Sequence, residues 1–366
     1  MKSVEYEPFD LSDVSLVSRS VRPAGNAIRQ FATQYVTDLG VADDQPGHDS
    51  EVRVVLPTRM PQGKVPALIV NGSGAYLFSG MNLCDEDIEP MLPYVERGFA
   101  IIAYETDGCQ PDFERDPTSA DIAQMTRRYV ASKAGLINAK RAISYALEQF
   151  PEIDANQLYT IGHSSGAKQA LLLSTHDDRI RGCVAFAPAC QMDISSKMTV
   201  ARIGGSDAGE LTREVQRSMP LVHASKVSVP MLLVYSENDR ITRPAEVLTY
   251  AKAVGERAIA VPVNCDGHGA VPQAGFKLSL AWLISQSKNN ANQPLEANLV
   301  SSSPEDRVVD SPIKSAEPSK TQAPPQPHVP AAPQPVAEPG PLPVQQRSMR
   351  HPTFNPAGVQ DNPYVN

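Results

Sequence analysis

The strongest constraint on the fold is the pentapeptide Gly-His-Ser-Ser-Gly at residues 162–166, which stands between a strand-like and a helix-like segment. Residues 157–161 favour a strand, and residues 167–173 favour a helix. The two glycines let the backbone turn sharply without Cβ clashes, which pushes the central hydroxyl out of the turn. Such a pentapeptide arises by chance in roughly one chain in ten of this length, so the flanking pattern carries the prediction. Strand, turn and helix together predict that Ser164 is presented as a nucleophile.

The partners that a serine nucleophile needs are found further along the chain. A serine hydroxyl is activated by a base, and that base is oriented by an acid. Residues 230–235 form an apolar run that predicts a strand, and Asp239 lies just past its carboxyl end. A second run, residues 258–263, leads to His268, which has a glycine on each side and is predicted to lie in a tight loop. We therefore predict a catalytic triad of Ser164, Asp239 and His268.

Other polar residues near these positions are interpreted differently. Glu237 and Asp266 compete with Asp239 for the role of the acid because both are close to the predicted site in sequence. His163, next to the serine, is predicted to pack and to form hydrogen bonds within the turn. The sequence His-Asp-Asp at residues 176–178 resembles a metal-binding set, but it falls at the end of the predicted helix and favours a solvated turn.

Attack on a carbonyl also needs backbone N–H donors for the developing negative charge. One donor is expected from Ser165, the residue after the nucleophile. The other is expected where the buried strand at residues 66–70 runs into the glycine-rich segment Asn-Gly-Ser-Gly-Ala. Within that segment the N–H of Ser73 is the first candidate for an oxyanion-hole donor and the N–H of Gly74 is the second.

From residue 51 onward, strand-like and helix-like segments alternate. Such alternation predicts a mostly parallel central sheet with helices on both faces. The predicted strands include residues 52–56, 65–70, 98–104 and 182–187, and the predicted helices include residues 126–150 and 276–287. Because ligands bind at the carboxyl ends of parallel strands, we expect Tyr104, and Tyr76 after the oxyanion loop, to line a substrate pocket.

With these motifs in place, the chain resembles the α/β-hydrolases, and within them the dienelactone-hydrolase-like esterases and the catalytic domain of the prolyl oligopeptidases. The resemblance covers roughly residues 51–287 and implies the triad and oxyanion roles given above. The chain departs from the pattern at Asn71-Gly72, where many relatives have His-Gly, and at Ala167, where many have glycine. Dienelactone hydrolases use a cysteine nucleophile, so serine at position 164 favours ordinary ester chemistry.

The domain organisation is predicted from the range that the resemblance covers and from composition. Residues 1–50 are predicted to be an N-terminal extension that packs on the sheet, and residues 51–287 to be the catalytic domain. The resemblance implies a small cap at residues 188–229, although an ordinary helix with loops is the alternative. Residues 288–366 hold 16 of the 33 prolines and are predicted to be a disordered tail. Such a tail either docks on a partner protein or is simply solvated.

Composition excludes several classes of function. A net charge of −8 argues against nucleic acid as a partner, because phosphate binding needs a basic face. No apolar run approaches the roughly 18 residues of a membrane span, and the N-terminus lacks the apolar segment of a signal peptide. The five cysteines have unrelated spacings, which favours reduced thiols and a cytoplasmic location. No zinc-type spacing is present, so neither a metal nor a cofactor is expected.

The predicted function is hydrolysis of a small-molecule carboxylic ester by a serine hydrolase. One alternative is a short-peptide peptidase of the prolyl oligopeptidase type. Only about 50 residues precede the predicted catalytic domain, too few for the β-propeller of those peptidases, which favours esters. The other alternative is a non-catalytic hydrolase scaffold whose proline-rich tail recruits a partner.

Overall fold

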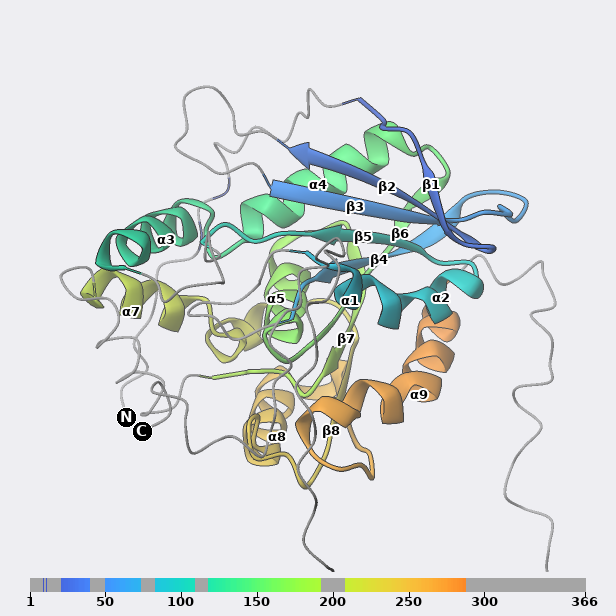
Figure 1. Ribbon diagram of the computed structural model, residues 1–366. Coiled ribbons are helices and arrows are strands. Elements are labelled where there is room, and N and C mark those ends of the chain that lie inside the picture. Colours follow the sequence, from blue (N-terminus) through green and yellow to red (C-terminus); the bar gives the residue numbers. More distant parts are fainter. Residues whose placement is uncertain are drawn as a thin grey trace, which may run out of the picture. The chain divides into compact units, whose positions relative to one another are not determined.

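The computed structural model describes residues 21–39, 50–73, 83–108, 118–191 and 208–287, together with Phe9 and Leu11. All of them belong to one compact unit, Met1–Leu295. Within them, nine strands form one sheet in the order β1-β2-β3-β5-β4-β6-β7-β8-β9 (Figure 1). Three sequence predictions lie wholly outside the described residues: the disordered tail, the oxyanion donor Gly74 and the pocket residue Tyr76.

The sheet is antiparallel at one end and parallel over the rest. Strands β1, β2, β3 and β5 pair antiparallel in turn, whereas all pairings from β5 through β4 to β9 are parallel. The strands are β1 (Asn26–Arg29), β2 (Ala32–Leu39), β3 (Ser50–Pro57), β4 (Val65–Asn71), β5 (Ala100–Tyr104), β6 (Ile153–His163), β7 (Ile180–Phe186), β8 (Met231–Tyr235) and β9 (Ala258–Pro262). The mostly parallel sheet is therefore confirmed, and β1 and β2 extend it on the N-terminal side.

Helices cover both faces of this sheet, as predicted. On one face the apolar side chains of α4 (Leu136–Gln149), α5 (Ser164–His176) and α8 (Pro244–Val254) pack on the strands. On the other face lie α1 (Asp85–Ile88), α2 (Leu92–Glu96) and α9 (Val271–Gln286). The side chains of β4 and β5 are buried on both faces, which explains why those segments read as continuous apolar runs.

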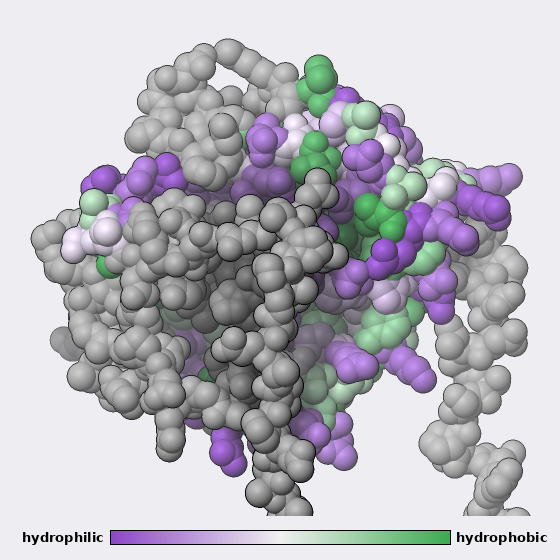
Figure 2. All heavy atoms as spheres, in the orientation of Figure 1, coloured by the Kyte–Doolittle hydropathy of each residue, from purple (hydrophilic) through white to green (hydrophobic). Residues whose placement is uncertain are grey.

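The remaining described helical elements connect or flank this core: η1 (Glu89–Met91), α3 (Ser119–Ala131), α7 (Ala208–Arg217), η3 (Pro220–Lys226), η4 (Gly255–Arg257) and η5 (His268–Ala270). None of the described helices combines the length and apolar character needed to cross a membrane. On the face shown in Figure 2, hydrophilic residues cover much of the described surface and hydrophobic residues are scattered among them.

The prediction of one helix over residues 126–150 is wrong, because the chain forms two helices, α3 and α4. Lys133, Ala134 and Gly135 have φ of 53°, 54° and 84°, in the left-handed region that a right-handed helix cannot contain. Gly135 is also required by a tertiary contact, since a Cβ there would lie 2.6 Å from Cγ2 of Thr106. A contact between distant segments thus breaks a helix that local periodicity predicts.

The solvated turn predicted at residues 176–178 is also wrong. Asp177 is buried and forms an ion pair with Arg179 at 2.6 Å. Burial by itself raises the pKa of this carboxyl, but the hydrogen bonds and charge of Arg179, with Lys140, lower it overall. Nε2 of His176 lies 3.3 Å from Nδ1 of His223, in η3. The end of α5 is therefore anchored to its surroundings.

The predicted cap, residues 188–229, is described in part. Its described helical elements are α7 and η3, and residues 192–207 lie outside the described part of the chain. A hydrogen bond of 2.8 Å between the hydroxyls of Tyr129 and Ser218 joins α3 to the residue after α7. Whether these elements cover a substrate site stays a prediction.

Candidate active site

Ser164 lies where β6 ends and α5 begins. Its φ is +55°, an uncommon conformation that costs free energy in a residue with a Cβ and that clusters at functional sites. The central strand β6 ends at His163, and α5 starts at the serine itself. Strand, strained serine and helix follow one another as the pentapeptide predicts.

The two glycines of the pentapeptide each have a specific packing role. A Cβ on Gly162 would lie 2.4 Å from the backbone C and O of Gly166. A Cβ on Gly166 would lie 2.7 Å from the carbonyl oxygen of Asn71, at the end of β4. Backbone atoms cannot move aside as flexible side chains can, so both positions require glycine. The turn is thereby pressed against the strand end that precedes the predicted oxyanion loop.

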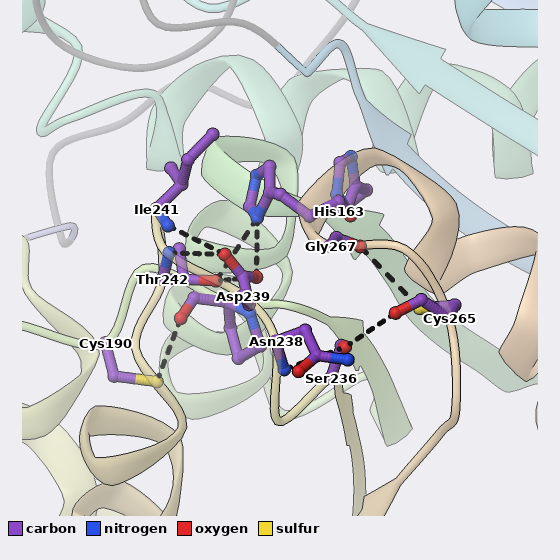
Figure 3. Close-up of polar contacts among 11 residues, drawn as sticks. His163, Cys190, Ser236, Asn238, Asp239, Ile241, Thr242, Cys265 and Gly267 are labelled. Atoms are coloured by element: carbon purple, nitrogen blue, oxygen red, sulfur yellow. Dashed lines mark hydrogen bonds and ion pairs between the residues drawn. The ribbon is translucent and has the colours of Figure 1, made fainter. Parts of the chain in front are cut away.

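The carboxylate of Asp239 accepts four hydrogen bonds in the loop after β8 (Figure 3). Its Oδ1 accepts the backbone N–H groups of Ile241 at 2.8 Å and Thr242 at 3.0 Å. Its Oδ2 accepts the hydroxyl of Thr242 at 2.8 Å and Nδ1 of His268 at 2.7 Å. Burial by itself raises the pKa of Asp239, but these donors, His268 first, lower it overall and keep the carboxylate ionised.

This geometry separates the three candidates for the acid. Asp239 is buried and contacts His268, whereas Glu237 and Asp266 are exposed. The loop favours Asp239 over the other two acids, because the N–H groups of residues 241 and 242 converge on the carboxylate at position 239.

His268 lies in the loop after β9, at the start of η5. The glycine before it has φ of 78°, which permits the tight entry that the flanking glycines predict. This loop is fastened to the end of β8, because Val263 N–H donates to the carbonyl of Tyr235 at 2.8 Å and Ser236 Oγ donates to that of Cys265 at 3.3 Å. Nδ1 of His268 is bound to Asp239, so the predicted role as a base would fall to Nε2.

His163 contacts the predicted base, His268, directly. Its Nε2 lies 3.1 Å from the carbonyl oxygen of His268, and the two rings are 4.6 Å apart between centroids at 41°. Burial, followed by the charge of His268, lowers the pKa of His163 to about 4. The side chain is therefore a neutral hydrogen-bond donor at neutral pH, which agrees with its predicted role in packing and hydrogen bonding.

The residues predicted for the oxyanion hole are described in part. Ser165 is the first residue of α5 after the nucleophile. The N–H of Ser73 donates to Oδ1 of Asp87 at 3.3 Å. Asn71 stands where many α/β-hydrolases have histidine. Its Nδ2 donates to Tyr104 O and Thr106 Oγ1, each at 2.9 Å. It therefore ties the carboxyl ends of β4 and β5 together beside the elbow.

Tyr104 belongs to the hydrophobic core on the α4 face, where its side chain is fully buried. Burial raises the pKa of its hydroxyl above the ordinary value. This position favours a packing role, and its predicted part in a substrate pocket stays a prediction.

Thr242 was missed by sequence reasoning. Its spacing of three residues after an aspartate is the signal that could have identified it, since such hydroxyls commonly bond a nearby Asp or backbone group. Among the described residues, no group of three His, Cys, Asp or Glu side chains could hold a metal ion.

Comparison with known proteins places this site in a familiar fold. Residues 137–270 match the prolyl oligopeptidase family. No curated protein matches the chain in sequence. Among solved structures, the acetyl xylan esterase from Paenibacillus sp. R4 superposes with a TM-score of 0.55 at 16% identity, over 73% of this chain and 88% of the esterase. The acylaminoacyl peptidase from Pyrococcus horikoshii superposes with a TM-score of 0.54 at 14% identity, over 72% of this chain.

A structure from Klebsiella pneumoniae, assigned as a dienelactone hydrolase, is similar at 17% identity and a TM-score of 0.49, over 69% of this chain and 98% of that one. The chain spans less than half of the length of the acylaminoacyl peptidase structures that it matches, from 40% to 43% of each. At these identities the likeness concerns the fold. The chain thus has the α/β-hydrolase fold, and over residues 137–270 it is similar to the prolyl oligopeptidase family.

Proposed function

We propose that the protein cleaves a carboxylic ester of a small molecule, with Ser164 as nucleophile, His268 as base and Asp239 as acid. The observation that carries the proposal is the 2.7 Å contact between Asp239 and Nδ1 of His268 on a loop that also touches the residue before Ser164. The family match and the fold support a serine hydrolase in general.

The mechanism follows from the protonation states at the site. Because the ionised Asp239 accepts the proton on Nδ1 of His268, Nε2 is the basic nitrogen. As the Ser164 oxygen bonds to the ester carbon, its proton moves to Nε2, and the imidazolium is stabilised by the carboxylate. The same proton then passes to the alkoxide as the ester C–O bond breaks, leaving an acyl-enzyme. Water repeats the sequence, which releases the acid and restores the Ser164 hydroxyl.

We further propose that the oxyanion accepts the N–H of Ser165 and one N–H from the segment after β4. In the structure the N–H of Ser73 donates to Asp87, so it would have to exchange that bond for the oxyanion. We therefore favour Gly74 as the second donor. Removing one such donor typically lowers kcat by roughly 100- to 1,000-fold.

A short-peptide peptidase is the second candidate, and the match to the prolyl oligopeptidase family over residues 137–270 favours it. An ester is placed first because the similar acetyl xylan esterase is matched over 88% of its length, against 43% for the acylaminoacyl peptidase. A panel of p-nitrophenyl esters of increasing acyl length, assayed beside p-nitroanilides of acylated amino acids and dipeptides, separates the two. Higher kcat/KM on the anilides would replace the ester proposal with the peptidase.

Covalent labelling with a fluorophosphonate tests the nucleophile. We expect one labelled peptide, containing Ser164, and no label or turnover in Ser164→Ala. Ser285→Ala, at an exposed serine of α9, is the matched control and should label as the wild type does. Turnover that survives in Ser164→Ala would overturn the proposal, and absence of label in a folded wild-type protein would favour a non-catalytic scaffold.

A further inference from the structure

Within the described part of the chain, His163 links the nucleophile turn to the base loop. It is the last residue of β6 and directly precedes Ser164, while its ring packs against the ring of His268. Its Nε2 is 3.1 Å from the carbonyl oxygen of His268, a residue 105 positions further along the chain. Since a carbonyl only accepts, Nε2 must carry the proton and donate it.

Several other contacts of the base loop come from the end of β8 and the loop that follows it. Asp239 and Thr242 hold the imidazole from the loop after β8, and Ser236 holds the carbonyl of Cys265. These contacts fix the loop relative to β8. The contact with His163 ties the loop to the residue that directly precedes Ser164.

The neutral state of His163 is compatible with a position beside His268. Its burial, then the charge of His268, lowers its pKa to about 4, so the ring is neutral at neutral pH. A neutral neighbour 4.6 Å away does not repel the imidazolium that forms at His268 during proton transfer. A permanently charged lysine or arginine at position 163 would oppose that step.

We propose that His163 is a positioning residue that holds the base loop against the nucleophile elbow and so sets the approach of His268 to Ser164. The inference rests on the proposed serine hydrolase mechanism and adds a residue to it. His163 does not touch substrate in this proposal; it acts through the backbone of His268. Because misplacement of a catalytic group by about 1 Å can cost roughly 100-fold in rate, one hydrogen bond at this position has a measurable effect.

A matched pair of variants tests the hydrogen bond. In His163→Gln the side-chain amide nitrogen reaches the position of Nε2, whereas in His163→Asn it is one methylene too short. We expect kcat on the best p-nitrophenyl ester to fall by about 10- to 100-fold in the Asn variant with KM changed less than about threefold. The Gln variant should recover most of the lost kcat. His163→Phe, which keeps an aromatic ring without the donor, should behave like the Asn variant.

His176→Gln is the control for substitution of a half-buried histidine, because His176 is the last residue of α5, whereas His163 directly precedes the first. Its kcat per folded molecule should match the wild type, with melting temperature measured for every variant. Equal kcat in the Gln, Asn and Phe variants would overturn the inference. So would a fall in kcat that merely follows the loss of melting temperature. If Ser164→Ala keeps its activity, the proposed function fails. If Ser164→Ala is inactive but the variants at position 163 keep the wild-type kcat, only the positioning role fails.

Discussion

The two ends of helix α5 each carry a pair of packed histidine rings. At the N-terminal end His163 and His268 are 4.6 Å apart, and at the C-terminal end His176 and His223 are 4.7 Å apart. Burial is the main cause of a lowered pKa in His163, His176 and His223. By ring contact and burial alone the two pairs look alike.

Their surroundings separate them. His268 contacts the ionised Asp239 and lies next to the residue before a strained serine. The other pair has cations as charged neighbours, and the pKa of His176 falls to about 3 because of burial, then His223, Lys226, Lys140 and Arg217. A carboxylate partner favours the protonated form that a base must reach, and neighbouring cations oppose it. Burial alone therefore does not make a histidine a base.

The largest effect on activity is expected when an aspartate is replaced by asparagine, and the result should differ between the two ends of α5. Asp239→Asn removes the charge that orients and stabilises His268, so we expect kcat/KM to fall by about 1,000- to 10,000-fold with the fold intact. Asp177→Asn, at the buried ion pair beyond the other end of α5, should lower stability and leave kcat/KM per folded molecule near wild type. Steady-state kinetics and circular dichroism on both variants check this. Comparable losses of kcat/KM would remove the functional distinction between the two ends.

Gly162→Ala tests the packing of the elbow. A Cβ there meets backbone atoms at 2.4 Å, so we expect a loss of more than about 3 kcal/mol in the free energy of unfolding, or no folded protein. Gly209→Ala is the control, because its new Cβ would meet nothing closer than Nη1 of Arg213 at 3.8 Å. That variant should be neutral or stabilised by up to about 1 kcal/mol. Urea unfolding gives both values, and wild-type stability in Gly162→Ala would contradict the packing described here.

His223→Phe tests the C-terminal pair. Nε2 of His223 donates to the carbonyl of Arg217 at 2.6 Å, and Phe9 stacks on its ring at 5.8 Å between centroids. Phenylalanine keeps the stacking and leaves that carbonyl without its donor, so we expect a loss of about 1–3 kcal/mol in stability. Activity per folded molecule should not change. A selective loss of kcat would mean that this end of α5 also serves the reaction.

The smallest expected effect is a loss of folding stability in mild acid. His163, His176 and His223 are neutral in the folded protein, with lowered pKa values, whereas in the unfolded chain they take up protons near about pH 6.5. The unfolded state therefore binds more protons, and stability falls as the pH decreases from about 6.5 toward 4. The carboxylates of Asp177 and Asp239, with pKa values lowered below the ordinary range, add to the loss only at still lower pH.

Urea midpoints measured at intervals from pH 7.5 to 4.5 check this slope. The double variant His176→Gln with His223→Gln should show a flatter dependence on pH than the wild type. An identical slope in the two proteins would show that this pair does not contribute to the acid sensitivity.

Much of the architecture was predictable from local sequence patterns. The apolar runs identified most of the sheet, and the pentapeptide around Ser164 predicted the turn that the structure contains. Both are short-range features, because strand propensity and the steric freedom of glycine act within a few residues. The apolar runs before Ser164, Asp239 and His268 also predicted that these residues follow the ends of strands, where the structure has them.

Tertiary structure decided what depends on contacts between distant segments. The converging N–H groups of Ile241 and Thr242 distinguish Asp239 from its two acidic neighbours, and Thr106 packed against Gly135 helps to divide a predicted helix. The bond from His163 to His268 spans 105 residues. The sequence by itself determined most of the strands and which residue is presented at the turn, because those features depend on residues close together in the chain. The folded structure decided which acid, which supporting hydroxyl and which histidine meet there, because those partners come together only when the ends of separate strands share one edge of the sheet.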